Sequence, residues 1–341
     1  MTTALPPDEI ATTTTMEGGE EKVASLWSRI KRLFSFREAG ILFVLIALCV
    51  ILSIVAPRFL TLRNVTNVVR QFSVIAIMSV GMTYVIITAG IDLSVGSIVA
   101  LSGCMTAWFL VEGYPIWLSV LIGLALGTLT GIVNGLLIVK VRLAPFIATL
   151  GTMGIARGVV LALTMGYPIQ PFPEAFEVIG RGYLGPIPIP VVIMAVVVIA
   201  GHIFLGRTTV GRYIYYVGSN PTAARLSGLN VGRILILVYT VAGLLSGLAA
   251  VVLVSRLTSA QSNMGTGWEL DAIAAVVIGG TSLAGGEGSV LGSLIGAALM
   301  GVIKNALILL GVNVYWQSVV IGIVIVLAVA LDAWRQSRRP A

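Results

Sequence analysis

The chain has 341 residues, of which 57% are hydrophobic and 10% are charged, and its mean hydropathy is +1.03. This composition lies outside the range of soluble globular domains and predicts an all-α, polytopic membrane protein. The formal net charge is +7, but basic residues that flank apolar spans follow the positive-inside rule, so we expect no nucleic-acid partner. Cys49 and Cys104 both lie in apolar runs, so we expect neither a disulfide framework nor a metal site.

Residues 1–38 differ in composition from the rest of the chain. The stretch "ATTTTMEGGEEK" is polar and low in complexity, with too little apolar surface to fold, which predicts a disordered cytoplasmic tail. It is not arranged like a cleaved signal peptide. The basic stretch that follows, "LWSRIKRLFSFR", suits a helix lying on an anionic lipid surface. A basic flank that only sets the orientation of the first span explains it equally well.

From residue 39 onward, apolar segments repeat at close to the roughly 20 residues that a helix needs to cross a bilayer. We predict about ten transmembrane helices in a domain over residues 39–335, followed by a cytoplasmic tail, 336–341. The third, sixth and eighth helices are the shortest. The expected spans lie near residues 39–57, 71–89, 95–111, 116–139, 145–165, 190–205, 233–254, 271–283, 290–310 and 315–333.

An even number of spans places both termini on one side of the membrane, and the basic residues indicate which side. Of the 21 Lys and Arg residues, 14 lie on the predicted inner segments and five on the outer ones. Because cytoplasmic loops carry the excess of basic residues, we expect both termini in the cytoplasm. Arg157 and Lys304 fall within spans. A charge there costs about 2.5–3.5 kcal/mol, so each should face the bundle interior or reach an interface.

Small residues recur at every fourth position in several predicted spans. Helices that pack tightly in lipid present such ridges, because small side chains allow close approach of two backbones. We therefore expect a compact bundle, although ridges that let helices slide during transport have the same sequence. The four ridges are Gly123, Gly127, Gly131 and Gly135; Gly154 and Gly158; Gly243 and Gly247; and Gly288, Gly292 and Gly296.

Two polar, glycine-containing breaks interrupt the spans, in "ITAGIDLSVGSIVALSG" and in "VIGGTSLAGGEGSVLGS". Irregular backbone at membrane depth is tolerated where it is buried in protein or lines a watered cavity. The helices that resume near Ser94 and Ser289 present N–H groups and a positive dipole end. Asp92, Ser94, Arg157 and Ser289 are thus candidates for a translocation path, whereas helix capping explains Asp92 and Ser94 equally well.

The source of energy is constrained by two absences in the sequence. Acidic residues deep in the spans are scarce, with Asp92 the main candidate and Asp271 and Glu287 at span ends, which argues against coupling to a proton or sodium gradient. The phosphate-binding pattern GxxxxGK[ST] does not occur, so we expect no bound ATP, no other cofactor and no catalytic residue on this chain. Another polypeptide must then supply the energy.

The hydrophilic segment "SNPTAARLSG" lies between two predicted spans and has its own helix signals. Asn220 is a good N-cap, Pro221 fits the first helical turn, and Gly228 fits a left-handed stop. The predicted helix is about two turns long. Helices below roughly 12–15 residues are marginal alone in water, so another surface must hold this one.

The angular positions of its residues suggest how this helix is held. Ala223, Ala224 and Ser227 share a face, Leu226 flanks it and Arg225 points elsewhere. The small face is therefore expected to press into a groove on a cytoplasmic partner. A helical turn that only connects two spans is the alternative.

Three motifs together closely resemble the permease subunits of bacterial ATP-binding-cassette (ABC) importers for ribose, xylose, arabinose and related monosaccharides. The blocks are "GMTYVIITAGIDLSVGSIVALSG" (81–103), "GRYIYYVGSNPTAARLSGLNV" (211–231) and "VIGGTSLAGGEGSVLGSLIGA" (277–297). The resemblance covers about residues 40–335. It implies a dimer of permeases in the bacterial inner membrane, cytosolic ABC ATPase subunits that bind ATP and Mg²⁺, and a periplasmic sugar-binding protein.

The resemblance also implies that the cytoplasmic loop 206–232 holds the segment that docks into the ATPase, which maps here to Asn220 through Gly228. Ser219 stands where the family often has glycine, and Pro221-Thr222 replaces what is often a more polar pair. These departures bear on which ATPase is the partner. The proline-rich outer loop, 166–190, with Glu174, Glu177 and Arg181, is a candidate landing surface for the binding protein, or else an ordinary extended loop.

The sequence thus predicts a monosaccharide permease that works by alternating access with a pentose or related sugar. An ion-coupled secondary sugar transporter is the main alternative. A membrane scaffold or receptor without solute flux is the second alternative.

Overall fold

The computed structural model of the chain describes residues 36–337, and within them the ordered structure is almost entirely helical. The predicted all-α, polytopic architecture is confirmed. The predicted N-terminal tail, its basic amphipathic stretch and most of the C-terminal tail lie outside the described residues. The helices are α2 (Phe36–Val55), α3 (Leu62–Ile87), α4 (Val95–Val111), α5 (Ile116–Val139), α6 (Pro145–Thr164), α7 (Glu174–Arg181), α8 (Ile189–Arg207), α9 (Thr209–Ser219), α10 (Pro221–Leu226), α11 (Val231–Leu257), α12 (Trp268–Ile278), α13 (Val290–Leu309) and α14 (Val314–Ser337), and the strands are β1 (Tyr183–Leu184) and β2 (Ile187–Pro188).

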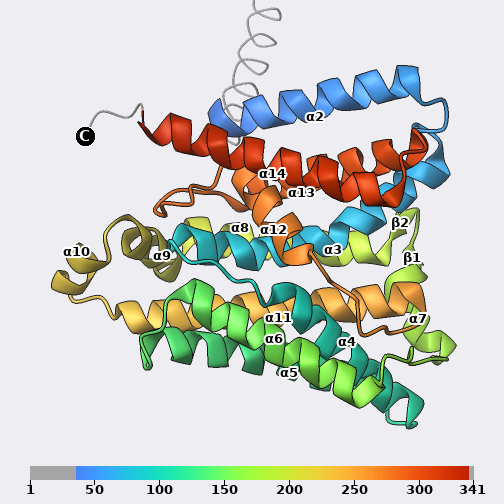
Figure 1. Cartoon of the computed structure of the whole chain (residues 1–341), viewed down its shortest axis with the longest axis horizontal. Helices are drawn as coiled ribbons and strands as arrows, with labels where there is room; N and C mark the ends of the chain where they lie inside the picture. Colours follow the sequence, from blue (N-terminus) through green and yellow to red (C-terminus); the bar gives the residue numbers. More distant parts are fainter. Residues whose placement is uncertain (1–35, 338–341) are drawn as a thin grey trace, which may run out of the picture.

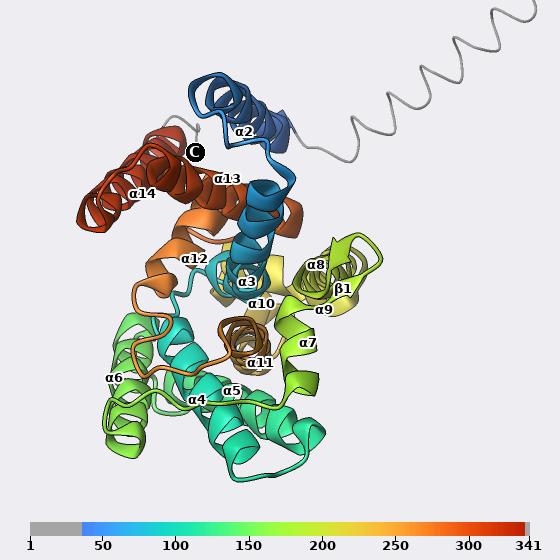
Figure 2. The same cartoon turned by 90° about the vertical axis from the view of Figure 1, so that its right-hand side faces the viewer.

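The long helices run side by side along the longest axis of the molecule (Figure 1). Helix α10 lies at one end of this bundle, and α7 with the antiparallel pair β1 and β2 lies at the opposite end. We call these the α10 end and the α7 end. Viewed along the bundle, α11 lies among α3, α4, α5 and α7 (Figure 2). Its residues Val238 and Tyr239 are completely buried, so α11 forms the centre of the packed core.

Within the described residues, seven helices are long and apolar enough to cross a membrane, and α4 and the segment Tyr315–Leu327 are shorter apolar helices. The sixth expected span is longer than predicted, because α8 has 19 residues. The eighth, 271–283, is wrong as a full span. Its place is taken by α12, which has 11 residues and therefore covers only about half of a 30 Å hydrocarbon core at 1.5 Å per residue. The left-handed Gly280 (φ +92°) stops it.

Polar caps explain where several helices begin. The side chains of Thr61, Thr208, Asn230 and Ser289 accept backbone N–H bonds in the first turns of α3, α9, α11 and α13, respectively. Each such bond satisfies one of the donors that a helix start leaves without an intrahelical partner. In an apolar chain these short polar residues therefore fix the helix boundaries.

The glycine ridges predicted on two spans meet in a seam between α5 and α11. A Cβ atom at Gly127 would lie 2.5 Å from the carbonyl oxygen of Gly243, and one at Gly135 would lie 2.7 Å from the Cα of Ile236. Both distances are below normal contact, so only glycine allows this approach. In the same way, Gly296 of the fourth ridge packs against the backbone of Ala275 in α12. Small residues thus allow these helices to approach closely, as expected for helices that pack in lipid.

Substitution in this seam should destabilise the fold. Gly131→Val places side-chain atoms against the Tyr239 carbonyl of α11, and overpacking of this kind costs about 1–3 kcal/mol. We expect a lower midpoint of thermal unfolding in detergent. Gly322→Val is the matched control, because Gly322 in α14 is exposed and has no neighbour within 4 Å. Equal midpoints for the two variants would contradict the seam.

The second predicted ridge, on α6, is wrong as a contact within this chain. At Gly154 and Gly158, and at Gly151 on the same helix, a Cβ atom would meet no other atom within 4 Å. Ile155 beside them is 68% exposed. The small-residue pattern alone does not distinguish a helix face that packs inside the chain from one that is left open.

Candidate functional site

The short helix predicted from "SNPTAARLSG" is present as α10, and its start and stop signals are confirmed. The Asn220 side chain accepts hydrogen bonds from the backbone N–H groups of Thr222 (3.0 Å) and Ala223 (2.9 Å). Pro221 occupies the first helical position. At the other end Gly228 has φ +83°, a conformation that favours glycine. The helix is therefore fixed at both ends by local chemistry.

The orientation of α10 differs from the one expected. Ala224 is only 5% exposed and packs into the core of its own chain, whereas Leu226 is 85% exposed. The expected docking face of Ala223, Ala224 and Ser227 is therefore wrong at Ala224, because this side of the short helix packs against its own chain, with α9 and α11 as its neighbours. The exposed members of the predicted docking set are Asn220, Pro221, Ala223, Arg225, Leu226, Ser227 and Gly228.

Two breaks interrupt the bundle, residues 88–94 (the first break) and residues 279–289 (the second break). Helix α9 joins α10 to the second break and to the end of α3, directly before the first break. Gly218, near the end of α9, is buried, and a Cβ atom there would overlap the carbonyl oxygen of Ile87, the last residue of α3. The same carbonyl accepts a 2.8 Å hydrogen bond from the N–H of Gly286 in the second break. One turn earlier, the Tyr215 hydroxyl donates to the Gly288 carbonyl (2.7 Å). Helix α9 therefore connects α10 to the end of α3 and to the second break.

The first break is held by a buried polar network around Asp92 and Ser94. One carboxylate oxygen of Asp92 accepts the backbone N–H (2.8 Å) and the hydroxyl (2.6 Å) of Ser94. The Ser94 hydroxyl accepts from the Asn134 amide of α5 (2.8 Å), whose oxygen accepts from Thr152 of α6 (2.6 Å). Asp92 and Ser94 are both 0% exposed. They stabilise the break and join it to two helices, rather than lining an open surface of this chain.

Sequence reasoning missed Asn134 and Thr152 as members of this network. The available signal was the side-chain amide of Asn134, a strongly polar group within a largely apolar span. Such a group needs hydrogen-bond partners inside the protein. Nothing in the sequence indicates that those partners are Ser94, 40 residues away, and Thr152.

The two other candidates for the path occupy different places. Ser289 caps α13 by accepting the N–H of Gly292 (2.9 Å), and its hydroxyl donates to the Glu38 carboxylate of α2. The Arg157 guanidinium of α6 donates to the carbonyls of Ser262 (2.6 Å) and Met264 (2.8 Å), which lie in the segment between α11 and α12. The structure therefore brings Asp92 and Ser94 together, but Ser289 and Arg157 each stabilise a separate irregular segment.

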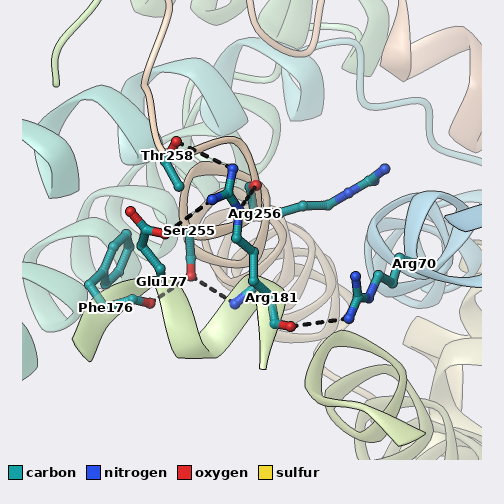
Figure 3. Close-up of polar contacts among 8 residues, drawn as sticks. Arg70, Phe176, Glu177, Arg181, Ser255, Arg256 and Thr258 are labelled. Atoms are coloured by element: carbon teal, nitrogen blue, oxygen red, sulfur yellow. Dashed lines mark hydrogen bonds and ion pairs between the residues drawn. The ribbon is translucent and has the colours of Figure 1, made fainter. Parts of the chain in front are cut away.

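At the α7 end, the proline-rich loop forms α7 and the hairpin of β1 and β2, so the alternative of an ordinary extended loop is wrong over residues 174–188. Helix α7 is attached to α11 through Ser255, whose hydroxyl donates to the Phe176 carbonyl (2.6 Å) and accepts the N–H of Gly180 (2.7 Å). Figure 3 shows Arg181 between the Glu177 carboxylate (3.1 Å) and the Arg256 carbonyl (3.0 Å). These contacts hold α7 and Arg181 against the end of α11.

A third arginine, Arg70 of α3, joins the same group. It donates to the Arg181 carbonyl (3.1 Å), and its guanidinium lies 4.5 Å from the centre of the Tyr183 ring. The Arg256 side chain extends toward the side on which Arg70 lies (Figure 3). Among the described residues, no carboxylate forms an ion pair with Arg70 or Arg256. Of the three guanidinium groups, that of Arg181 alone is paired with a carboxylate of the described residues, that of Glu177.

Comparison with known proteins gives one family and several close relatives. The model of the family described as branched-chain amino acid transport system / permease component matches residues 64–329. The chain is 48% identical over 303 residues to the ribose import permease protein RbsC of Escherichia coli (strain K12), which covers 88% of this chain and 94% of that protein. It is 46% identical over 290 residues (84% and 90%) to RbsC of Bacillus subtilis (strain 168).

A more distant relative is named for a different solute. The fructose import permease protein FrcC of Rhizobium meliloti is 38% identical over 294 residues, which are 82% of this chain and 81% of that protein. No solved structure matches the chain.

Proposed function

Because the chain belongs to the family of branched-chain amino acid transport system permease components, we propose that it is the transmembrane subunit of an ABC importer that moves a monosaccharide into the cytoplasm by alternating access. The names of its relatives, which are ribose and fructose import permeases, support a pentose or a related sugar as the solute. The protein is then a multi-pass component of the bacterial inner membrane, with the α10 end and both termini in the cytoplasm.

The observation that carries this proposal is the attachment of an exposed, capped helix to the end of α3 and to the second break. Helix α10 leaves the side chain of Leu226 exposed. Packing within the chain itself therefore does not stabilise this apolar side chain. Through α9, the helix contacts the ends of α3 and of the second break. This is the arrangement that a separate ATPase needs in order to act on the membrane bundle. ATP and Mg²⁺ are bound by that partner, which fits the lack of a phosphate-binding loop in this sequence.

The α7 end is the side proposed to receive a periplasmic sugar-binding protein. Arg70, Arg181 and Arg256 lie together there, and among the described residues only Arg181 has an ion-pair partner, Glu177. A basic surface of this kind attracts acidic side chains of a partner, and complementary charges raise the rate and the specificity of association.

Charge reversal at this surface should weaken docking. For Arg256→Glu we expect the concentration of loaded binding protein that gives half-maximal uptake to rise about tenfold, the factor for one weakened charge pair of about 1.4 kcal/mol. The measurement is sugar uptake by proteoliposomes at varied binding-protein concentration. The control is Arg63→Glu, which reverses an exposed arginine on α3 at the same end. A similar shift in both variants would mean that overall charge, rather than this cluster, is responsible.

A second permease copy is proposed to cover α6. Gly151, Gly154 and Gly158 form an open ridge there, and small residues let transmembrane helices approach closely. Within the described residues of one chain, this ridge has no packing partner. A second permease subunit that packs on α6 provides one. An identical copy, giving a homodimer, and a related permease, giving a heterodimer, both fit this ridge.

The experiment that tests the function is D-ribose uptake by cells that express the chain with the ATPase and the binding protein of its own organism. We expect uptake to continue after an uncoupler abolishes the proton gradient, as long as ATP is maintained. We also expect the ATPase to co-purify with the chain. Loss of uptake with the gradient would favour an ion-coupled carrier, and no uptake under any condition would favour a scaffold or receptor.

A further inference from the structure

A small open pocket lies between α3, α12 and α13. It is lined by Gln71, Phe72, Trp268, Asp271 and Lys304 among other residues, and its volume is about 50 Å³. This is enough for several water molecules or for hydroxyl groups of a solute. The pocket is separate from the buried networks at the two breaks. None of its polar residues is used in the contacts of α9 or α10 described above.

The polar chemistry of the pocket centres on an intramembrane ion pair. Lys304 on α13 donates to the carboxylate of Asp271 on α12. An ionisable residue within a transmembrane segment is costly and by default points to a functional site. The lysine has three donors, and within the described residues its hydrogen bond goes to Asp271 alone. Gln71, which is exposed, adds an amide that can both donate and accept.

The combination of groups selects one class of solute. The charges of Asp271 and Lys304 cancel, so the pocket offers strong hydrogen bonds without favouring an anion or a cation. Trp268 adds a large apolar face with a polar N–H. A concave site with an aromatic wall and a few convergent polar groups is typical of small-molecule binding sites. A neutral, polyhydroxylated molecule with one apolar face matches this set.

The position of the pocket connects it to the rest of the bundle. Trp268 and Asp271 lie in the first turn of α12, just after the segment 258–267 that Arg157 stabilises. The other end of α12 is Gly279, where the second break begins. Helix α9 contacts the same break at Gly286 and Gly288, so we expect a displacement of α9 to reach α12, which forms one wall of the pocket.

We infer that this pocket is a subsite for the transported solute, in which Trp268 packs on the apolar face of a sugar and the Asp271–Lys304 pair binds its hydroxyl groups. The inference rests on the proposed function and names the residues of this chain that meet the solute. It also predicts the effect of α12 movement: the subsite changes shape as the ATPase acts, so that the solute is held and then released.

The first test measures occupancy without transport. In the full chain with Cys49→Ala and Cys104→Ala, Gln71→Cys is labelled with a polar maleimide in nanodiscs, with and without millimolar D-ribose. We expect D-ribose to slow the labelling, while L-leucine does not. The control is Gln261→Cys, an exposed position in the segment 258–267, where neither compound should slow the reaction. No protection at Gln71→Cys, equal protection at both positions, or protection by leucine instead of ribose would each overturn the inference.

The second test separates solute binding from stability. In the complete complex, Asp271→Asn should lower the amount of D-ribose moved per ATP hydrolysed by about tenfold, the effect of one lost charged hydrogen bond, while ATP hydrolysis continues. The exchange variant Asp271→Lys with Lys304→Asp restores an ion pair but inverts its polarity, and its ratio should stay low. A fully restored ratio would mean that the pair is only structural. Failure of the proposed function would instead appear as no ATP-dependent uptake by the unsubstituted chain.

Discussion

Replacing Gly218 by valine should reduce sugar uptake to background while the protein still inserts into the membrane. A Cβ atom at this position overlaps the Ile87 carbonyl and lies 2.7 Å from the backbone nitrogen of Gly286. Because both neighbours are backbone atoms, α9 must separate from the end of α3 or from the second break. Overpacking costs about 1–3 kcal/mol in well-packed proteins, and here that cost falls on the contact that we propose couples α10 to the bundle. The measurement is ATP-driven uptake at matched membrane levels of the chain.

The matched control for this variant is Gly206→Val. Gly206 lies near the end of α8, three residues before α9, and has no neighbour within 4 Å. We expect its uptake to be close to that of the unsubstituted chain. Normal uptake by Gly218→Val would contradict the route from α9 to the breaks, and so would loss of uptake in Gly206→Val alone.

Replacing Leu226 by glutamate should uncouple the ATPase from the permease. Leu226 is 85% exposed on α10, which makes it the most prominent apolar contact that the helix offers a partner. Truncation of a central interface residue costs about 2 kcal/mol or more, or about thirtyfold in affinity, and a buried charge is worse than truncation. We expect the ATPase to dissociate during purification and uptake to be lost, with the chain itself stable.

Two variants make this result specific. Ala224→Glu places a charge in the chain's own core, where Ala224 is 5% exposed, so it should reduce the amount of folded protein rather than only the coupling. Val141→Glu changes a 59% exposed residue in the loop between α5 and α6 and should leave coupling intact. Retention of the ATPase by Leu226→Glu, or its loss in Val141→Glu, would show that α10 is not the docking helix.

The family and the membrane fold were predictable from the sequence, and both predictions are confirmed. Apolar length is set by the bilayer, so most spans are visible as runs of hydropathy. Helix boundaries are harder to predict where a helix is longer or shorter than its apolar segment. Helix α3 begins at Leu62, nine residues before its expected start, because its first turns contain Arg63, Asn64, Asn67 and Arg70. These residues are polar but helical, and hydropathy reports only the part of a helix that is apolar.

Helix α12 shows the opposite difficulty. Its sequence is as apolar as that of a span, yet the helix is short and both of its ends lie in irregular segments. An apolar composition indicates that a segment avoids water. It does not show whether the segment lies in lipid or in the interior of the protein. The glycines after Ile278 are the available signal. In the sequence, they are equally consistent with a break after a complete span and with an early end of a short helix.

The site was predictable only where the chemistry is local. The caps of α10 follow from Asn220, Pro221 and Gly228, which act on neighbouring residues. The burial of Ala224 depends on α9 and α11, and the pairing of Lys304 with Asp271 joins residues 33 positions apart. Contacts of this kind depend on how the helices pack, and this packing cannot be read from a single sequence. The roles of the proposed docking and path residues therefore remain predictions.

We propose that a separate ATPase, acting through α10, drives the movement of solute. It is tested most directly by purifying the chain and measuring D-ribose accumulation in sealed vesicles, first alone with an imposed proton or sodium gradient, and then with its ATPase, its binding protein and ATP. We expect accumulation only in the second case. Accumulation by the chain alone, driven by either gradient, would contradict it.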